Sequence, residues 1–170
     1  MNLKRSLLPF LLLAAVAGCA RREEEPAADT ADAQAPAETA APPKVVADVR
    51  AEIGLSPAAE AQLKAQGDRI LVEAIFAGDP TPEAQSQTNE LGLVELGKTS
   101  KAIPGAGPVE FDKSSIDDSR LELIIGQPQV ILNVRSEKGL VVCPMFWDSV
   151  KSAAEKIAQI TCTLPGEAAQ

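Results

Sequence analysis

Short apolar runs separated by glycine and proline constrain the fold of this chain most strongly. Segment 69–76 carries Ile70, Val72, Ala74 and Phe76 at every second position, which places them on one face of a β-strand. Further candidate strands are 91–96, 109–111, 121–125, 130–134, 140–143 and 158–164, and turn residues stand between them at 78–82, Gly97, 104–108, 126–128 and Gly139. This pattern predicts a mainly β domain, a small β-sandwich-like fold with one or two short helices.

Three segments carry helical signals. Ser56-Pro57 fits an N-cap followed by the first helical position, and the helix would continue over 58–65 and stop at Gly67-Asp68. Apolar residues three and four apart predict a short helical turn within 45–54. The same spacing over 148–157 predicts a helix that crosses between the last two strands. An α+β or α/β domain is the alternative fold.

The composition divides the chain into distinct regions. Residues 21–44 contain four prolines and many alanines but no leucine, isoleucine, valine or aromatic residue, so they cannot bury enough apolar surface to fold. We therefore expect a disordered tether over 19–44, whose flexible part spans about 25–30 Å. A single globular domain is expected over 45–165, and a flexible tail over 166–170.

The N-terminus has the features of an export signal. Lys4 and Arg5 precede an apolar run of about eleven residues, 7–17, which is too short for a bilayer that requires about 20. The run ends in Val16-Ala17-Gly18-Cys19, which resembles the lipobox of bacterial lipoprotein signal peptides. The resemblance implies that 1–18 are removed and that the Cys19 thiol carries a diacylglycerol, with further acylation such as palmitate. Two acyl chains are sufficient for a stable membrane anchor.

Two further features bear on where such a lipoprotein is held. Ala20, rather than an aspartate, follows the cysteine, and in enteric lipoproteins this implies the periplasmic face of the outer membrane. The segments GDPTPEA, NELGLVELG and NVRSEKGLVVC resemble a set of small uncharacterised proteobacterial lipoproteins with β-rich domains. That resemblance implies an envelope location and provides no catalytic residue.

The charge and the missing residue types exclude several classes of function. Removal of 1–18 takes away two basic residues and no acidic one, so 14 basic side chains remain against 24 acidic, a net charge of −10. This balance argues against nucleic acid as a partner. The chain contains no histidine and no tyrosine, which excludes Ser–His–Asp and Cys–His catalysis and histidine-ligated metals. We predict no cofactor.

Carboxylates are the remaining candidates for a metal or catalytic site. The densest cluster consists of Glu110, Asp112, Asp117, Asp118 and Glu122. Calcium requires six to eight oxygen ligands, and several could come from such a segment. The spacing fits no known calcium loop, so we favour a solvated acidic loop over a cation site.

Two residue pairs near the C-terminus complete the candidates. Phe146 and Trp147 are adjacent aromatic residues, which we expect to cap the core, with a partner-binding patch as the alternative. Cys143 and Cys162 remain as an even pair once Cys19 is acylated, and in an oxidising envelope they predict a disulfide. If helix 148–157 lay along the sheet, the pair would be too far apart; if the helix crosses the domain end, the cysteines face each other.

These observations together predict a lipid-anchored envelope protein with a non-catalytic binding or scaffolding domain. Its membrane contact would be the lipid anchor, and another envelope protein is the expected kind of partner. An envelope enzyme that uses carboxylates alone is one alternative. A carrier of a small ligand or a cation is the other.

Overall fold

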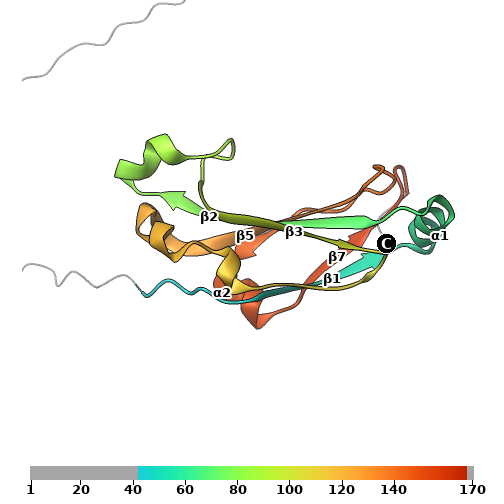
Figure 1. Cartoon of the computed structure of the whole chain (residues 1–170), viewed down its shortest axis with the longest axis horizontal. Helices are drawn as coiled ribbons and strands as arrows, with labels where there is room; N and C mark the ends of the chain where they lie inside the picture. Colours follow the sequence, from blue (N-terminus) through green and yellow to red (C-terminus); the bar gives the residue numbers. More distant parts are fainter. Residues whose placement is uncertain (1–41, 168–170) are drawn as a thin grey trace, which may run out of the picture. The chain divides into compact units, whose positions relative to one another are not determined.

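Two β-sheets pack face to face in the computed structural model, which describes residues 42–167 (Figure 1). The strands of this part are β1 (Val49–Leu55), β2 (Ile70–Pro80), β3 (Val94–Ile103), β4 (Gly107–Phe111), β5 (Ile124–Ser136), β6 (Phe146–Ser149) and β7 (Ala158–Cys162). The helices are α1 (Pro57–Gln66) and α2 (Val150–Glu155), with 3₁₀ turns η1 (Pro82–Gln87), η2 (Lys113–Ser115) and η3 (Asp118–Leu123). The mainly β, sandwich-like fold predicted from the sequence is confirmed.

The two sheets differ in how their strands are connected. The first, called sheet A, has the order β4-β1-β7, in which β1 runs antiparallel to β4 and parallel to β7. The second, sheet B, has the order β3-β2-β5-β6 and is antiparallel throughout. Strands β2 and β5 form the long centre of sheet B, whereas no two strands of sheet A are consecutive in sequence.

The hydrophobic core lies between the sheets. The alternation along β1 and β2 directs every second side chain inward, and Ile53 and Phe76 are fully buried there. Phe111 enters the same core from β4. Burying one side chain of this size contributes about 2–3 kcal/mol. Helix α1 closes one end of the sandwich, and α2 packs toward the other end (Figure 1).

The helical turn predicted over 45–54 is wrong, because this segment contains β1. Val49, Ala51 and Ile53 are at most 1% exposed and alternate with polar residues, which is strand periodicity. Neighbours on both sides form hydrogen bonds with β1, and this long-range pairing outweighs the weak three- and four-residue spacing of the valines.

Several predicted strand boundaries also need correction. Segment 121–125 is largely η3, because Asp117 caps a 3₁₀ turn there, and β5 begins only at Ile124. Segment 140–143 contributes a single bridge, from Val142 to Thr163, rather than a strand. Residues 78–80 of the turn predicted at 78–82 lie inside β2, and the turn predicted at 126–128 lies inside β5, where the two strands pair around a shift in register. Gly97, also predicted as a turn, lies inside β3. Strand pairing thus continues through glycine and proline.

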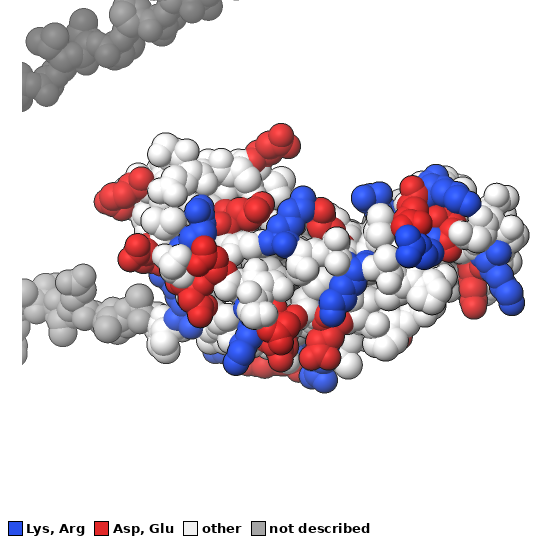
Figure 2. Space-filling view, viewed as in Figure 1, with Lys and Arg blue, Asp and Glu red and all other residues white. Residues whose placement is uncertain are grey.

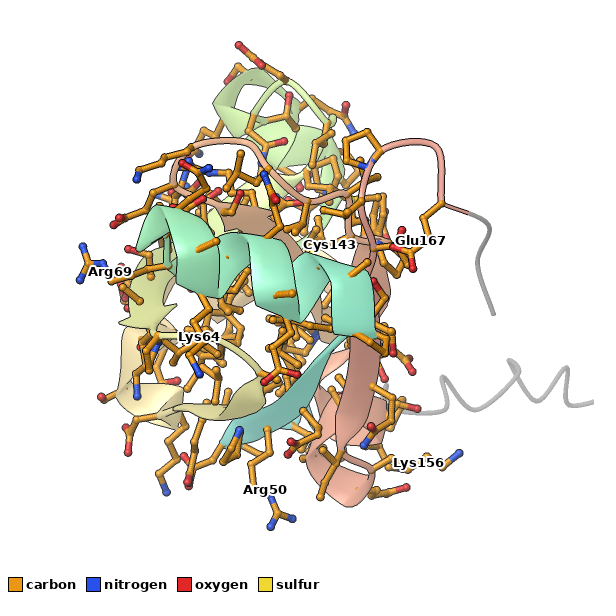
Figure 3. All side chains as sticks on the ribbon, turned by 90° about the vertical axis from the view of Figure 1, so that its right-hand side faces the viewer. Arg50, Lys64, Arg69, Cys143, Lys156 and Glu167 are labelled. Atoms are coloured by element: carbon orange, nitrogen blue, oxygen red, sulfur yellow. A yellow bond between two sulfur atoms is a disulfide. The ribbon has the colours of Figure 1, made fainter. Side chains whose placement is uncertain are left out.

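Helix α1 has the ends predicted from the sequence. The Ser56 hydroxyl accepts a hydrogen bond from the Ala59 N–H at 3.2 Å, and Gly67, with φ of 56°, ends the helix. The same hydroxyl donates to the Glu167 carboxylate at 2.6 Å, and this bond, together with the Leu164 N–H, lowers the pKa of Glu167. Figure 3 shows Glu167 beside the end of α1. The folded part therefore reaches Glu167, beyond the boundary predicted at 165.

The predicted disulfide between Cys143 and Cys162 is present, with the Cα atoms 4.2 Å apart. The backbones of Val142 and Thr163 form two hydrogen bonds with each other, each donating one. Cys143 and Cys162 are the next antiparallel pair along the chain. Pairs of this kind have no backbone hydrogen bonds between them, and their Cα atoms approach most closely. Helix α2 is shorter than the predicted 148–157 and crosses from β6 in sheet B to β7 in sheet A. The arrangement with a crossing helix is thus the correct one of the two considered.

No helix in the described part of the chain, 42–167, is long and apolar enough to cross a membrane. The signal peptide predicted over 1–18, Cys19 and most of the predicted tether lie outside the described residues.

The disulfide links the β5–β6 connection of sheet B to β7 of sheet A, so its loss should loosen the contact between the layers. We expect Cys143→Ser/Cys162→Ser to lower the melting temperature by about 10 °C, because closing a loop of about 20 residues contributes about 3 kcal/mol. Calorimetry measures this shift. The matched control is Cys19→Ser, which removes a cysteine and leaves the bridge intact. Equal melting temperatures for the two variants would contradict the prediction.

Candidate functional site

An apolar row crosses the outer face of sheet B. The strand register places Ile75, Ile131 and Trp147 opposite one another on β2, β5 and β6. Their sequence neighbours, such as Phe76 and Leu132, point into the core, so the row faces away from sheet A. An outer sheet face is more often polar, and this row therefore distinguishes sheet B.

Part of the row lies beneath the segment that follows η1, residues 88–93, which projects from sheet B (Figure 1). Ile131 and Ala77 are fully buried, Leu93 is 5% exposed, and the three pack with Ile75 in a small cluster separate from the main core. The Asn89 side chain orders the segment by accepting hydrogen bonds from the N–H groups of residues 91 and 93. We call Ile75, Ala77, Leu93 and Ile131 the outer-face cluster.

Two large apolar side chains, Trp147 and Leu91, remain exposed beside the outer-face cluster. Trp147 is 46% exposed, and its indole N–H donates to the Gln129 side chain at 2.5 Å. Gln129 in turn donates to Asp79 at 3.0 Å, so the indole is held in one orientation. Leu91, at 53% exposed, lies in the projecting segment.

The structure separates the two aromatic residues that the sequence grouped together. Phe146 is half-buried and packs against the main core, as expected of a capping residue. Trp147 lies on the opposite face of the same strand, as the alternative of a surface patch requires. Successive residues of a strand point to opposite sides, so one strand serves both roles.

A hollow of about 380 Å³ lies between the sheet and the projecting segment. Ile75 and Leu91 supply its apolar lining, and Glu90 and Glu95 line it as well. The remaining lining residues are Asn89 and Lys98. Lys98 forms an ion pair with Glu73 at 3.0 Å, which offsets its charge. We call this space the outer-face hollow; it combines an apolar wall with acidic groups.

Two of the five acidic residues that the sequence singled out, Asp112 and Asp117, cap 3₁₀ turns. Asp112 accepts a hydrogen bond from the Ser114 N–H, and Asp117 accepts from both the hydroxyl and the N–H of Ser119. The side chain and then the N–H of Ser114 lower the pKa of Asp112, and the hydroxyl and then the N–H of Ser119 lower the pKa of Asp117. The remaining members lie apart, because Glu110 pairs in register with Arg50 on the outer face of sheet A, while Asp118 and Glu122 are exposed on η3. Within 42–167, no three Asp, Glu, Cys or His side chains are grouped to hold a metal.

A second, polar hollow of about 660 Å³ lies where η2 and η3 meet β3, and no sequence pattern had indicated it. The Asp117 N–H donates to the Leu96 carbonyl at 2.7 Å, and the Arg120 Nε donates to the Glu95 carbonyl at 2.8 Å. Glu95 and Asp117 both line this hollow. The Asp117 carboxylate is already hydrogen-bonded to Ser119, so the two do not form a free pair for acid–base chemistry.

A glutamine fixes the point where the chain enters the domain. The Gln127 side chain accepts from the Val45 N–H at 2.9 Å and donates to the Pro43 carbonyl at 3.0 Å. The Lys44 ammonium donates to the Leu121 carbonyl at 2.8 Å. Because of these contacts the ordered packing starts at Pro43, slightly before the boundary of 45 predicted from composition. Composition does not reveal this, since the Gln127 side chain is distant in sequence from the residues that it binds.

Comparisons with family models, with curated proteins and with solved structures found no match.

Gly97 permits the close contact between η2 and β3, since a Cβ there would lie 1.9 Å from the Ser115 carbonyl oxygen. We expect Gly97→Ala to push this segment from the sheet and lower the free energy of unfolding by about 1–3 kcal/mol. Urea unfolding measures the change. Gly105→Ala is the control, because its Cβ would meet nothing within 4 Å. The contact is unimportant if both variants unfold at the same urea concentration.

Proposed function

We propose that this chain is a lipid-anchored cell-envelope protein, held at the periplasmic face of the outer membrane, whose folded domain is a non-catalytic binding module. The lipobox ending at Cys19 supports the anchor. The observation that carries the binding function is the exposed pair Trp147 and Leu91 beside the outer-face cluster.

The geometry of Trp147 suits a binding residue. Its indole is fixed by Gln129, so little conformational freedom is lost when a partner covers it. Tryptophan is also among the residues that contribute most at protein interfaces. An outer face with an aromatic side chain held in place therefore favours recognition of another envelope protein over a purely structural role.

The carboxylate-only enzyme is less well supported. Such an enzyme needs two carboxyl groups directed at one substrate cavity, with different proton affinities. In the polar hollow one of the two candidates, Asp117, caps η3, and its pKa is lowered by that bonding. A cation carrier has no more support, because the acidic residues of 110–122 are engaged separately or lie apart on the surface.

The anchor is tested with Cys19→Ser in a Gram-negative bacterium. We expect the wild-type chain to enter the detergent phase of a Triton X-114 extraction and the variant to enter the aqueous phase, because the proposed lipid anchor is attached through the Cys19 thiol. Radiolabelled palmitate should be incorporated by the wild type alone. Cys143→Ser/Cys162→Ser is the control and should remain in the detergent phase. A wild-type chain found in the aqueous phase would refute the anchor.

The binding surface is tested by site-specific photocrosslinking in intact cells. A photoreactive amino acid at Leu91 should give a discrete crosslinked product, whereas the same group at Gln159, on the outer face of sheet A, should give none. Adding Trp147→Ala should reduce the product at least tenfold, as expected for a central interface residue. Circular dichroism checks that this variant is folded. Equal products from both faces, or none from either, would overturn the proposed surface.

A further inference from the structure

The charges around the outer-face hollow are unbalanced. Of the residues described in 42–167, only Arg69 with Glu137 and Lys98 with Glu73 form ion pairs. Neither Glu90 nor Glu95 forms one of these ion pairs, although both line the hollow. Asp79 adds a third carboxylate on the same face, next to Gln129. The projection formed by η1 and residues 88–93 carries acidic side chains at its ends and contains no lysine or arginine (Figure 2).

One basic side chain, Lys98, lines the hollow, and Glu73 engages its charge at 3.0 Å. Arg120 reaches the Glu95 carbonyl from the polar hollow. The next basic side chain along β2 and β5 is remote from the hollow. Arg135 lies opposite Leu71 on the strands that also carry Ile131 and Ile75, four residues further along. Four residues of a strand correspond to about 13 Å. This exceeds the screening length of about 8–10 Å in physiological salt, so Arg135 offsets little of the negative potential at the hollow. The hollow is therefore an acidic site with an apolar wall.

Resting on the proposed binding function, we propose that the outer-face hollow receives a basic segment of a partner protein. An apolar side chain of that segment enters the hollow against Ile75 and Leu91. Lysine or arginine residues on either side of it contact the carboxylates of Glu90 and Glu95. The volume of about 380 Å³ lies within the range of about 300–1,000 Å³ found for ligand pockets, which is sufficient for one large side chain.

Charge complementarity selects this occupant over the other candidates. An anionic membrane surface and a second copy of this acidic chain both place negative charge against Glu90 and Glu95, which is unfavourable. A neutral apolar segment would leave both carboxylates partly desolvated without a partner. A basic segment satisfies the apolar wall and the acidic groups together.

Direct binding is tested by NMR on the ¹⁵N-labelled mature chain, 19–170, carrying Cys19→Ser. The probe is the peptide acetyl-Gly-Lys-Leu-Lys-Gly-amide, compared with analogues in which glutamate replaces both lysines or serine replaces the leucine. We expect the lysine–leucine peptide to shift the amide signals of Ile75, Leu91 and Glu95 and to lose affinity at high salt. Both analogues should bind at least threefold more weakly.

Charge-matched variants then locate the site. Glu90→Gln/Glu95→Gln should weaken binding of the lysine–leucine peptide about three- to tenfold at low ionic strength, as expected for two exposed ion pairs. Glu52→Gln/Glu110→Gln removes the same charge from the outer face of sheet A and should leave the affinity unchanged. Leu91→Ser should abolish the selectivity for leucine over serine.

The outcomes separate this inference from the proposed function. Three results would overturn the proposal of a basic segment. The first is equal binding of the glutamate peptide, and the second is a set of signal shifts that maps to another face. The third is an equal effect of the two double variants. If crosslinking at Leu91 still captured a partner in cells, the binding module would stand with a partner of different chemistry. Loss of both the peptide binding and the crosslink would overturn this inference and the proposed binding function together.

Discussion

Strand β1 is the element on which the rest of this domain depends. It lies at the centre of sheet A and forms hydrogen bonds with β4 on one side and β7 on the other. Because its partners lie about 60 and 110 residues away in sequence, neither pair can form as a local hairpin. Sheet A therefore assembles only when most of the chain is already in place. Such long-range pairing makes folding slow compared with that of a domain built from local contacts.

The inner faces of the two sheets share one core, but their outer faces differ. Sheet A presents Arg50, Glu52, Glu110 and Gln159 to solvent, which is the usual polar surface. Sheet B carries the outer-face cluster, the fixed indole of Trp147 and the acidic hollow. This asymmetry is what supports a binding role for sheet B, since both sheets are equally necessary for the core.

The chain enters the folded domain at the same end at which the segments around the proposed binding surface lie. Lys44 contacts the carbonyl of Leu121, and the Thr81 N–H, just before η1, donates to the Leu123 carbonyl. The backbone of η3 thus connects the start of the folded part to the base of the projection that carries Leu91. An anchor at Cys19 would pull on this end, whereas the disulfide secures the chain beside α1 at the opposite end (Figure 3).

The sequence by itself determined the features that depend on local chemistry. Among these are the strand alternation of β2, the caps at Ser56 and Gly67, and the exclusion of histidine chemistry. The two cysteines suggested a disulfide, but the path of α2 decided that they meet. Only the tertiary structure decided that 49–55 is a strand, that β5 continues past Gly126, and that Trp147 faces solvent while Phe146 faces the core. A short apolar run fits several local conformations. Its final one is set by the distant strand that pairs with it, and strand periodicity then assigns each side chain to a face.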